Sequence, residues 1–381
     1  MALDFEQGPI RPPSEATSLL IRVTRNCPWN RCEFCPVYKK ERFSFRTVEE
    51  IKGDIDTVKE MVSTLKQRSW QAGFGGKIER QFVETFLQED RHSDSLRSVA
   101  LWLYYGAESA FLQDANSIIM KTPELAEVIS YLKNSFPGLT RITSYARSQT
   151  LCHKSVDDLV LLRQAGLNRI HVGLESGSDK VLSYVRKGCT AAQHIDGGRR
   201  VVEAGIELSE YVMPGLGGRR LSRDHALETA RVLNAIHPHF IRIRSLAIPN
   251  GTPLREKWEK GEFERLSDEE IVQEERLFIE HLEGISSSVV SDHVLNLLEE
   301  VEGRLPEDKQ RILSVIDRFL SLPPQERMLF QLGRRLGLFR TLSDLDKPAL
   351  RGRAEQVKGK VVSQFGGNLE NAIRTLTERY I

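Results

Sequence analysis

The chain has 381 residues, 40% of them hydrophobic and 28% charged, and its 54 basic and 53 acidic residues leave a formal net charge of +1. This length predicts two or three domains, or one barrel-sized domain with an extension. The near-neutral charge argues against a protein that holds nucleic acid mainly by bulk electrostatics. No run approaches the ~18 apolar residues of a spanning helix, and the N-terminus lacks the pattern of a secretory signal. We therefore expect a cytoplasmic protein that does not enter the membrane.

The first 109 residues predict one strand and one clearly amphipathic helix. Residues 1–17 are polar and contain proline, which is typical of an N-terminal arm. Residues 18–24 predict a short strand. The sequence Thr47-Val48-Glu49-Glu50 has the form of a capping box and predicts the start of a helix that continues to about residue 66. Residues 68–109 are interpreted as an insertion, with a glycine-rich turn and a helix at about 78–88.

Between residues 110 and 255, short apolar runs alternate with segments of helical periodicity. Together with 18–24, the predicted strands are 110–114, 141–146, 169–175, 206–213 and 240–247. The predicted helices are about 122–136, 155–165, 178–185, 191–204 and 223–236. Such alternation implies a parallel sheet with right-handed crossovers. Six units are too few for an eight-unit barrel, which leaves an open barrel or a doubly wound sheet. We predict an α/β fold with a partial (β/α)6 TIM-like barrel over residues 18–255.

Residues 256–381 are predicted to be a mainly helical C-terminal extension, because the β pattern stops beyond Pro253. Ser267-Asp268-Glu269-Glu270 is a second capping box and predicts an amphipathic helix. A further helix is predicted from the apolar residues between Val294 and Val301. Residues 252–302 carry a net charge of −10 and residues 303–381 one of +6. These opposite charges are compatible with pairing between the two segments, and equally with two separately solvated faces.

Three of the five cysteines, Cys27, Cys32 and Cys35, lie within nine residues in a C-x4-C-x2-C pattern. An intracellular setting disfavours disulfides, and soft thiolates favour zinc or an iron–sulfur cluster. Structural zinc normally has four protein ligands, and no fourth ligand stands nearby. Three ligands on a [4Fe–4S] cluster would leave one iron open to a small molecule, and we favour this reading. Zinc completed by a distant residue and reduced structural cysteines are the alternatives. Cys152 and Cys189 are expected to be small packing residues.

A strand, a three-cysteine loop with Phe34 just before the last cysteine, and a chain of βα units resemble the radical S-adenosylmethionine (SAM) superfamily. The resemblance covers about residues 15–255. The segment RIHVGLESGSDKVLSYVRKG (Arg169–Gly188) is similar to the fourth strand and following helix of one branch. That branch contains oxygen-independent coproporphyrinogen oxidase, elongator-type enzymes and methylthiotransferases. The commonest family loop is C-x3-C-x2-C, so this chain has one extra residue between its first two cysteines.

The resemblance implies that Cys27, Cys32 and Cys35 each bind one iron of a [4Fe–4S] cluster. The fourth iron would be chelated by the amino and carboxylate groups of SAM, and Phe34 would pack beside the adenine. The other positions that match cofactor contacts in the family are Gln113, Asp114, Ser144, Arg147, Glu175, Lys187, Glu210 and Gly215.

These positions match the family to different degrees. Gln113 and Asp114 stand where the family has a Gly-Gly-Glu-like turn that meets the SAM amino group, but this chain lacks the glycine pair. The resemblance implies ribose or carboxylate contacts for the residues after the third strand, and a SAM-carboxylate contact for Lys187. It implies a ribose contact for Glu210 and a glycine-rich turn at Gly215.

The predicted function is that of a radical SAM enzyme, an oxidoreductase in the broad sense. SAM would be cleaved reductively to a 5′-deoxyadenosyl radical that abstracts hydrogen from an unknown substrate. The expected partner is an electron donor of the flavodoxin or ferredoxin type. No catalytic residue is predicted. One alternative is an RNA-modifying radical enzyme, since the branch contains some, although the neutral charge does not favour RNA. The other is a non-enzymatic zinc or iron–sulfur binding module.

Overall fold

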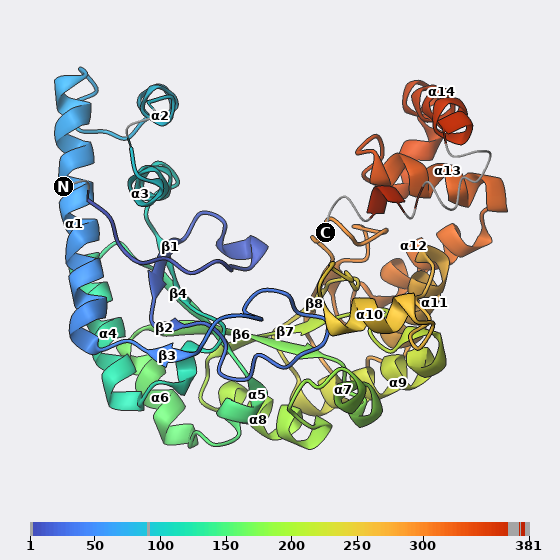
Figure 1. Cartoon of the computed structure of the whole chain (residues 1–381), viewed down its shortest axis with the longest axis horizontal. Helices are drawn as coiled ribbons and strands as arrows, with labels where there is room; N and C mark the ends of the chain where they lie inside the picture. Colours follow the sequence, from blue (N-terminus) through green and yellow to red (C-terminus); the bar gives the residue numbers. More distant parts are fainter. Residues whose placement is uncertain (1–2, 90–91, 365–372, 374, 378–381) are drawn as a thin grey trace. The chain divides into compact units, whose positions relative to one another are not determined.

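A computed structural model describes residues 3–89, 92–364, 373 and 375–377 of the chain (Figure 1). The chain forms two compact units. The first unit comprises Met1–Asn30, Val37–Val172 and Arg200–Leu208, and the second unit comprises Arg31–Pro36, Gly173–Arg199 and Ser209–Ile381. The boundary between the units therefore passes through the three-cysteine loop.

The first unit is built from parallel strands and their connecting helices. Its elements are η1 (Pro13–Glu15), β1 (Leu19–Arg22), β2 (Thr24–Arg25), β3 (Ser44–Phe45), α1 (Val48–Gln71), α2 (Arg80–Leu87), α3 (Asp94–Tyr104), β4 (Ser109–Gln113), η2 (Ser117–Ile119), α4 (Thr122–Ser135), β5 (Arg141–Ala146), α5 (Ser148–Leu151), α6 (Val156–Ala165) and most of β6 (Leu167–Glu175). Strands β1, β4, β5 and β6 pair in parallel: Leu20 lies opposite Phe111, Phe111 opposite Thr143, and Thr143 opposite Arg169. Helix α4 packs between α1 and α6.

Local sequence signals explain where these helices begin. The predicted capping box before α1 is present, since Thr47 accepts from the Glu50 backbone and the Glu50 side chain accepts from the Thr47 backbone. The predicted helix at 78–88 is α2. Helix α3 was not predicted, although Ser93 caps it by accepting the backbone N–H of Leu96. A single serine before a mixed sequence is a weaker signal than a capping box.

The second unit continues the strand–helix alternation. Its elements are the end of β6, α7 (Asp179–Tyr184), most of α8 (Ala191–Glu203), most of β7 (Glu207–Val212), α9 (Gly218–Ile236), β8 (Phe240–Ile243), α10 (Pro253–Glu259), α11 (Asp268–Glu280), β9 (Ser288–Val290), β10 (Gly303–Arg304), α12 (Lys309–Ser321), α13 (Pro324–Arg335), η3 (Leu342–Asp346) and α14 (Pro348–Gln364). Strands β7, β8 and β9 are parallel, with Tyr211 opposite Arg242 and Arg242 opposite Val290. Strand β10 is antiparallel to β9.

The six predicted strands are all present, as β1, β4, β5, β6, β7 and β8, and the predicted parallel α/β fold is confirmed. The predicted domain limits at residues 17 and 255 stay predictions, because the two compact units instead have their boundary within β6 and β7. The two units are defined by contacts between residues in space. Nothing in the sequence of β6 or β7 shows that each strand contributes to both units.

Two predictions for the C-terminal part were wrong. The β pattern does not stop at Pro253, because Ser288–Val290 forms β9 beside β8. The segment from Val294 to Val301 is not a helix, and apolar spacing alone misled us there. Asn296 is 1% exposed in that segment and binds neighbouring backbone and hydroxyl groups, which favours an irregular loop over a helix.

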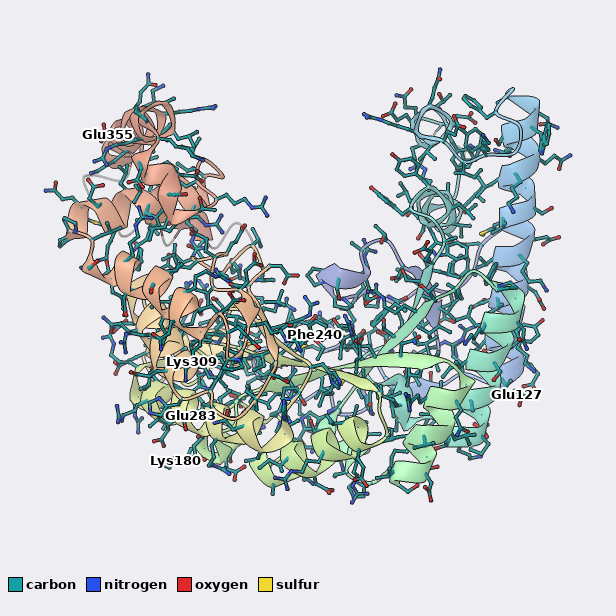
Figure 2. All side chains as sticks on the ribbon, turned by 180° about the vertical axis from the view of Figure 1, so that it is seen from behind. Glu127, Lys180, Phe240, Glu283, Lys309 and Glu355 are labelled. Atoms are coloured by element: carbon teal, nitrogen blue, oxygen red, sulfur yellow. The ribbon has the colours of Figure 1, made fainter. Side chains whose placement is uncertain are left out.

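The acidic and basic parts of the C-terminal region pair with each other, as one of our two readings proposed. The connecting ion pairs are Arg276–Asp317, Arg327–Glu269, Arg334–Glu299 and Arg335–Asp268. The Arg335 and Asp268 side chains are only 2% and 10% exposed, so this pair is largely shielded from solvent. Lys309 on α12 also donates to the carbonyl oxygens of Glu280 and Leu282 at the end of α11 (Figure 2). Acidic residues of segment 252–302 thus form ion pairs with basic residues of segment 303–381.

Candidate cofactor site

Cys27 is the cysteine of the loop that lies in the first unit. Its thiol is free and half-buried, and its Sγ accepts the backbone N–H of Asn30 at 3.4 Å. Asn30 has a φ of +47° and also donates to the backbone carbonyl of Tyr38, so the turn after Cys27 is tied to the following segment. Trp29 lies in this turn, and the guanidinium carbon of Arg147 is 5.3 Å from the centroid of the Trp29 ring.

Cys32 and Cys35 lie in the second unit, where Glu33 anchors the segment between them. The backbone N–H of Glu33 donates to the Val185 carbonyl at 2.9 Å, and the Glu33 carbonyl accepts from Leu254 at 3.1 Å. The buried Glu33 carboxylate also lies 2.5 Å from Lys257 Nζ and 3.3 Å from Arg186 Nε. The backbone and the side chain of Glu33 thus fix the segment between Cys32 and Cys35 through protein contacts alone.

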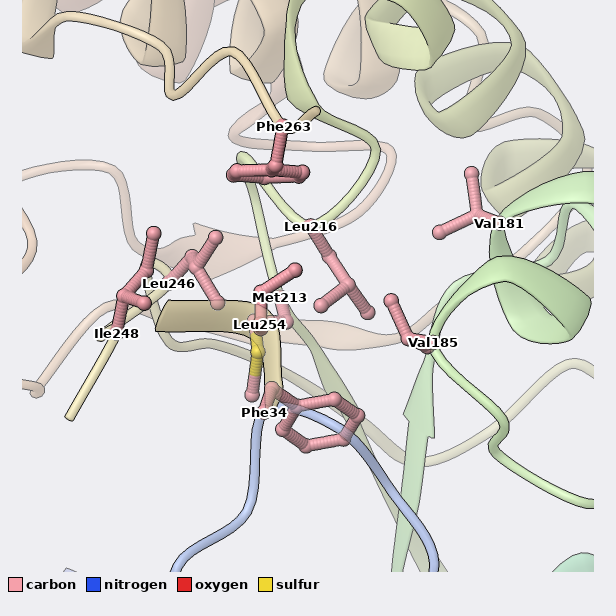
Figure 3. Close-up of a cluster of buried hydrophobic side chains, with 9 residues drawn as sticks. All are labelled: Phe34, Val181, Val185, Met213, Leu216, Leu246, Ile248, Leu254 and Phe263. Carbon is pink, nitrogen blue, oxygen red and sulfur yellow. The ribbon is translucent and has the colours of Figure 1, made fainter. Parts of the chain in front are cut away.

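Phe34 belongs to a buried apolar cluster in the second unit (Figure 3). The cluster comprises Phe34, Val181, Val185, Met213, Leu216, Leu246, Ile248, Leu254 and Phe263. Cys32 and Cys35 pack against it, and Lys187 Nζ lies 5.8 Å from the centre of the Phe34 ring. The two cysteines therefore have an apolar surface on one side, which limits the access of water to their sulfur atoms.

Glu175 and Lys187 form an ion pair in the second unit, with Nζ 3.1 Å from Oε1. Their side chains are 13% and 12% exposed, so the pair is sheltered but not closed off. A Cβ at Gly173 would lie 2.3 Å from Glu175 Oε1 and 3.0 Å from Lys187 Nζ, so a larger residue there would displace the ends of both side chains. The structure thus brings together two of the predicted cofactor contacts, with one charge of each sign.

Glu210 lies on β7 and is fully buried at 1% exposure. Burial raises its pKa well above the ordinary value, and the positive charge of Lys187 opposes this shift. Its Oε2 has no hydrogen-bond partner among the described residues. Glu210 therefore retains a polar atom without a partner, close enough to Glu175 and Lys187 for their charges to act on it.

Gly215 follows β7 with a φ of +88°, a conformation that favours glycine. Its N–H donates to Glu274 Oε1 on α11 at 2.7 Å. His225 on α9 donates through Nε2 to the Met213 carbonyl, at 3.1 Å, in the same turn. Sequence analysis missed both residues: Glu274 is 59 residues from the turn, and His225, on the helix that follows the turn, has no motif that marks it.

The buried groups behind this turn have altered pKa values. Burial lowers the pKa of His225 to about 4, so the ring is neutral at pH 7 and its Nδ1 accepts from Ser176 Oγ, 2.8 Å away. Burial raises the pKa of Glu274 to about 7. Burial and the neighbouring Glu274 and Asp268 raise the pKa of Glu275 to about 8. The turn at Gly215 therefore rests on groups that are neutral or close to neutral.

Gln113 and Asp114 are bound to protein partners in the first unit. The fully buried Gln113 amide accepts from the Gly8 N–H and donates to the carbonyls of Gly8 and Ile10. Asp114 accepts from Arg22 at 2.7 Å, from the backbone of Asn26 and from the Tyr38 hydroxyl. These side chains hold the N-terminal arm and the start of the cysteine loop. Their predicted part in SAM binding gains no support from these contacts.

Ser144 and Arg147 lie at and after the end of β5 in the first unit. Ser144 is fully buried, and its hydroxyl donates to the Leu112 carbonyl at 3.3 Å. The backbone N–H of Arg147 donates to Asn116 Oδ1 at 3.0 Å, and its guanidinium covers Trp29. Arg147 is thus directed toward the loop that carries Cys27, whereas Ser144 supports the sheet.

Among the described residues, no group of three or more His, Cys, Asp and Glu side chains is gathered closely enough to hold a metal ion. The ligand set Cys27, Cys32 and Cys35 stays a prediction. Cys152 and Cys189 are partly buried and form no disulfide, and Cys152 Sγ lies 3.2 Å from the Gln149 carbonyl. None of the helices in the described part of the chain is both long and apolar enough to cross a membrane.

Comparison with known proteins gives a family match and distant relatives. The family model described as Radical SAM superfamily matches residues 110–233. The tRNA uridine(34) acetyltransferase of Methanocaldococcus infernus is 20% identical over 281 residues, which cover 71% of this chain and 50% of that protein. The uncharacterized protein YtqA of Bacillus subtilis is 25% identical over 132 residues, which cover 35% of this chain and 40% of that protein. The chain spans half the length, or less, of these curated relatives.

Among solved structures, methylornithine synthase aligns with a TM-score of 0.41 and 15% identity, over 79% of this chain and 82% of that one. The radical SAM methyltransferase TsrM of Kitasatospora setae aligns with a TM-score of 0.43 and 14% identity, over 88% of this chain and 60% of that one. The matched residues 110–233 contain the ion pair Glu175–Lys187, Glu210 and the Gly215 turn. Residues 110–233 of the chain are therefore similar to the radical SAM superfamily.

Proposed function

We propose that the chain is a radical SAM enzyme with a [4Fe–4S] cluster bound by Cys27, Cys32 and Cys35. The observation that carries the proposal is the C-x4-C-x2-C loop of three half-buried cysteines in a chain whose residues 110–233 match the Radical SAM superfamily model. Thiolates are the preferred protein ligands of iron–sulfur clusters, and three of them leave one iron for a further ligand.

The residues of the second unit fit SAM. SAM carries an amino group and a carboxylate, and the sheltered pair Glu175–Lys187 offers one group of each opposite charge. The orphan Oε2 of Glu210 can accept a hydrogen bond from a ribose hydroxyl. The Gly215 turn, held by Glu274, allows a ligand to approach the backbone closely. Phe34 supplies an apolar surface for a base.

When bound, the cluster and SAM supply one-electron cleavage of SAM and a 5′-deoxyadenosyl radical. The chain's own residues bind, orient and shield. The apolar cluster around Phe34 excludes water beside Cys32 and Cys35. Glu33, held by Lys257 and Arg186, fixes the segment between these two cysteines. We further propose a cytoplasmic location and an electron donor of the flavodoxin or ferredoxin type.

Anaerobic purification and reconstitution test this proposal. We expect about four irons and four sulfides per chain, the broad visible absorption of an iron–sulfur cluster, and 5′-deoxyadenosine from SAM plus dithionite. Cys32→Ser should remove all three signals. Cys152→Ser and Cys189→Ser are matched controls and should keep them. A colourless protein with stoichiometric zinc would instead support a metal-binding module without this activity.

A second candidate is a radical enzyme that modifies RNA. The observation that favours it is the curated relative described as a tRNA uridine(34) acetyltransferase, which matches 71% of this chain. Binding of unmodified tRNA should then weaken steeply with salt, since each neutralised phosphate contributes roughly −0.9 to the slope of log K against log salt for a duplex. Binding that is absent at ~50 mM salt would remove this candidate.

A further inference from the structure

Four polar side chains lie at or just beyond the carboxyl ends of two neighbouring strands of the second unit. Strands β8 and β9 are parallel, with Phe240 opposite Ser288, so their carboxyl ends lie at the same edge. Arg242 and Arg244 stand on and just after β8, and Asp292 and His293 follow β9. In parallel α/β proteins, ligands bind at the carboxyl ends of the strands.

The segment after β8 lies beside the turn that contains Gly215. The backbone N–H of Arg244 donates to the Val212 carbonyl, and that of Leu246 donates to the Pro214 carbonyl, both at 2.9 Å. Leu246 also belongs to the apolar cluster around Phe34 (Figure 3). Arg244 therefore projects from a segment one strand away from the candidate cofactor turn.

Asn296 ties the segments after β8 and β9 together. Its Oδ1 accepts from the Ser245 backbone at 2.9 Å and from the Ser245 hydroxyl at 3.0 Å. Its Nδ2 donates to the Ile243 carbonyl at 2.8 Å and to Ser291 Oγ at 3.0 Å. A buried amide with four hydrogen bonds fixes both segments, so little ordering remains to be done when a ligand binds.

The two arginines have unused hydrogen-bonding capacity. Arg244 is exposed, and no ion pair to it occurs in the described part of the chain. The Arg242 side chain is 7% exposed and lies 3.0 Å from Asp292 through its NH1, while its Nε has no hydrogen-bond partner among the described residues. Arg242 lies on β8, and Arg244 is the first residue after it.

His293 adds a neutral donor. Its Nδ1 accepts the backbone N–H of Leu295 at 3.3 Å. Burial and the positive charge of Arg244 lower the pKa of His293 to about 4, so the ring is neutral at pH 7. A neutral imidazole whose Nδ1 accepts carries its proton on Nε2. No described residue accepts a hydrogen bond from that Nε2–H.

We propose that Arg244 and the His293 Nε2–H, backed by the Arg242–Asp292 pair, bind an anionic group of the substrate, either a carboxylate or a phosphate. The proposal rests on the proposed function, because the substrate is that of the adjacent cofactor site. A guanidinium binds either group through two parallel N–H bonds, and a neutral imidazole adds a third donor without adding charge. The anion thus anchors the substrate one strand from the Gly215 turn.

Calorimetric titration of the full chain, purified anaerobically, with inorganic phosphate and separately with glutarate at constant ionic strength, tests this subsite. We expect saturable binding of at least one probe at one site per chain, and the probe that binds identifies the substrate's anion. Arg244→Gln and His293→Ala should each weaken this binding at least ten-fold. Arg353→Gln removes the same charge from an exposed position on α14 and should leave it unchanged. Failure of both probes to saturate, or equal weakening by Arg353→Gln, would overturn the proposal.

The 5′-deoxyadenosine assay on the wild-type chain separates the two proposals. Binding that depends on Arg244, in a chain that makes no 5′-deoxyadenosine, would retain the anion subsite and refute the radical activity. Production of 5′-deoxyadenosine by a chain whose anion binding does not depend on Arg244 would refute the subsite alone.

Discussion

Asp114 in the first unit and the pair Glu175–Lys187 in the second unit were predicted from the same resemblance, yet they are held differently. Asp114 is fully buried and is bound by Arg22, Tyr38 and the Asn26 backbone. Glu175 and Lys187 bind each other and remain partly exposed. A polar group whose hydrogen-bonding capacity is used by the protein is structural, whereas one that is sheltered but still accessible can exchange its partner for a ligand.

Removing the Asp114 side chain should have the largest effect on folding, and it tests whether Asp114 is structural. Asp114→Ala removes the fully buried partner of Arg22, which keeps Glu6 and Asn26 as partners. Breaking a buried ion pair costs about 3–5 kcal/mol of unfolding free energy. Urea denaturation measures this cost, and Asp114→Asn serves if the alanine variant does not fold. A loss below ~1 kcal/mol together with lost SAM binding would show that Asp114 is a cofactor ligand after all.

Glu275 differs from both, because its carboxyl group is buried and forms no ion pair with any residue that the structure describes. Its pKa is raised to about 8 in the folded chain, against 4.5 for the free side chain, so the folded state holds its proton more tightly. Stability therefore falls as pH rises from about 4.5 through 8. Glu275→Gln should remove this contribution and raise the unfolding free energy at pH 8 by a few kcal/mol relative to pH 5.

Urea denaturation at pH 5 and pH 8 checks this prediction, with Glu280→Gln as the control on the half-exposed end of the same helix. The control should leave the pH dependence of the wild type unaltered. If Glu275→Gln is destabilised equally at both pH values, the carboxyl group does not hold a proton in the folded chain.

Lys187 should show the smallest effect on folding and a clear effect on binding. Lys187→Met removes one partner of a sheltered but partly exposed pair, so we expect it to lower the unfolding free energy by less than Asp114→Ala does. The dissociation constant of SAM for the reconstituted chain should rise at least ten-fold, because the proposed cationic partner of the SAM carboxylate is lost. Lys180→Met, on the neighbouring helix and paired with Asp224, should change neither quantity (Figure 2). Equal effects of the two variants would remove Lys187 from the cofactor site.

The sequence by itself determined the parallel α/β class, the six strands and two helix starts. Periodicity and capping boxes depend on residues within a few positions of one another, and Thr47–Glu50 and Ser267–Glu270 both form the predicted caps. The cysteine loop with Phe34 carried the resemblance to the radical SAM superfamily for the same local reason. The short β9 carried no such signal, because three residues are too few to show a period.

Only the tertiary structure decided which polar residues are free to bind a ligand. Nothing near Gln113 in the sequence shows that the backbone of Gly8 and Ile10 will use its amide, and nothing near Gly215 points to Glu274. Arg244, His293 and Asn296 likewise meet only when β8 and β9 pair. The donors and acceptors of these side chains are bound by residues that are distant in sequence. A motif therefore identifies the chemistry of a site, and the fold decides which residues perform it.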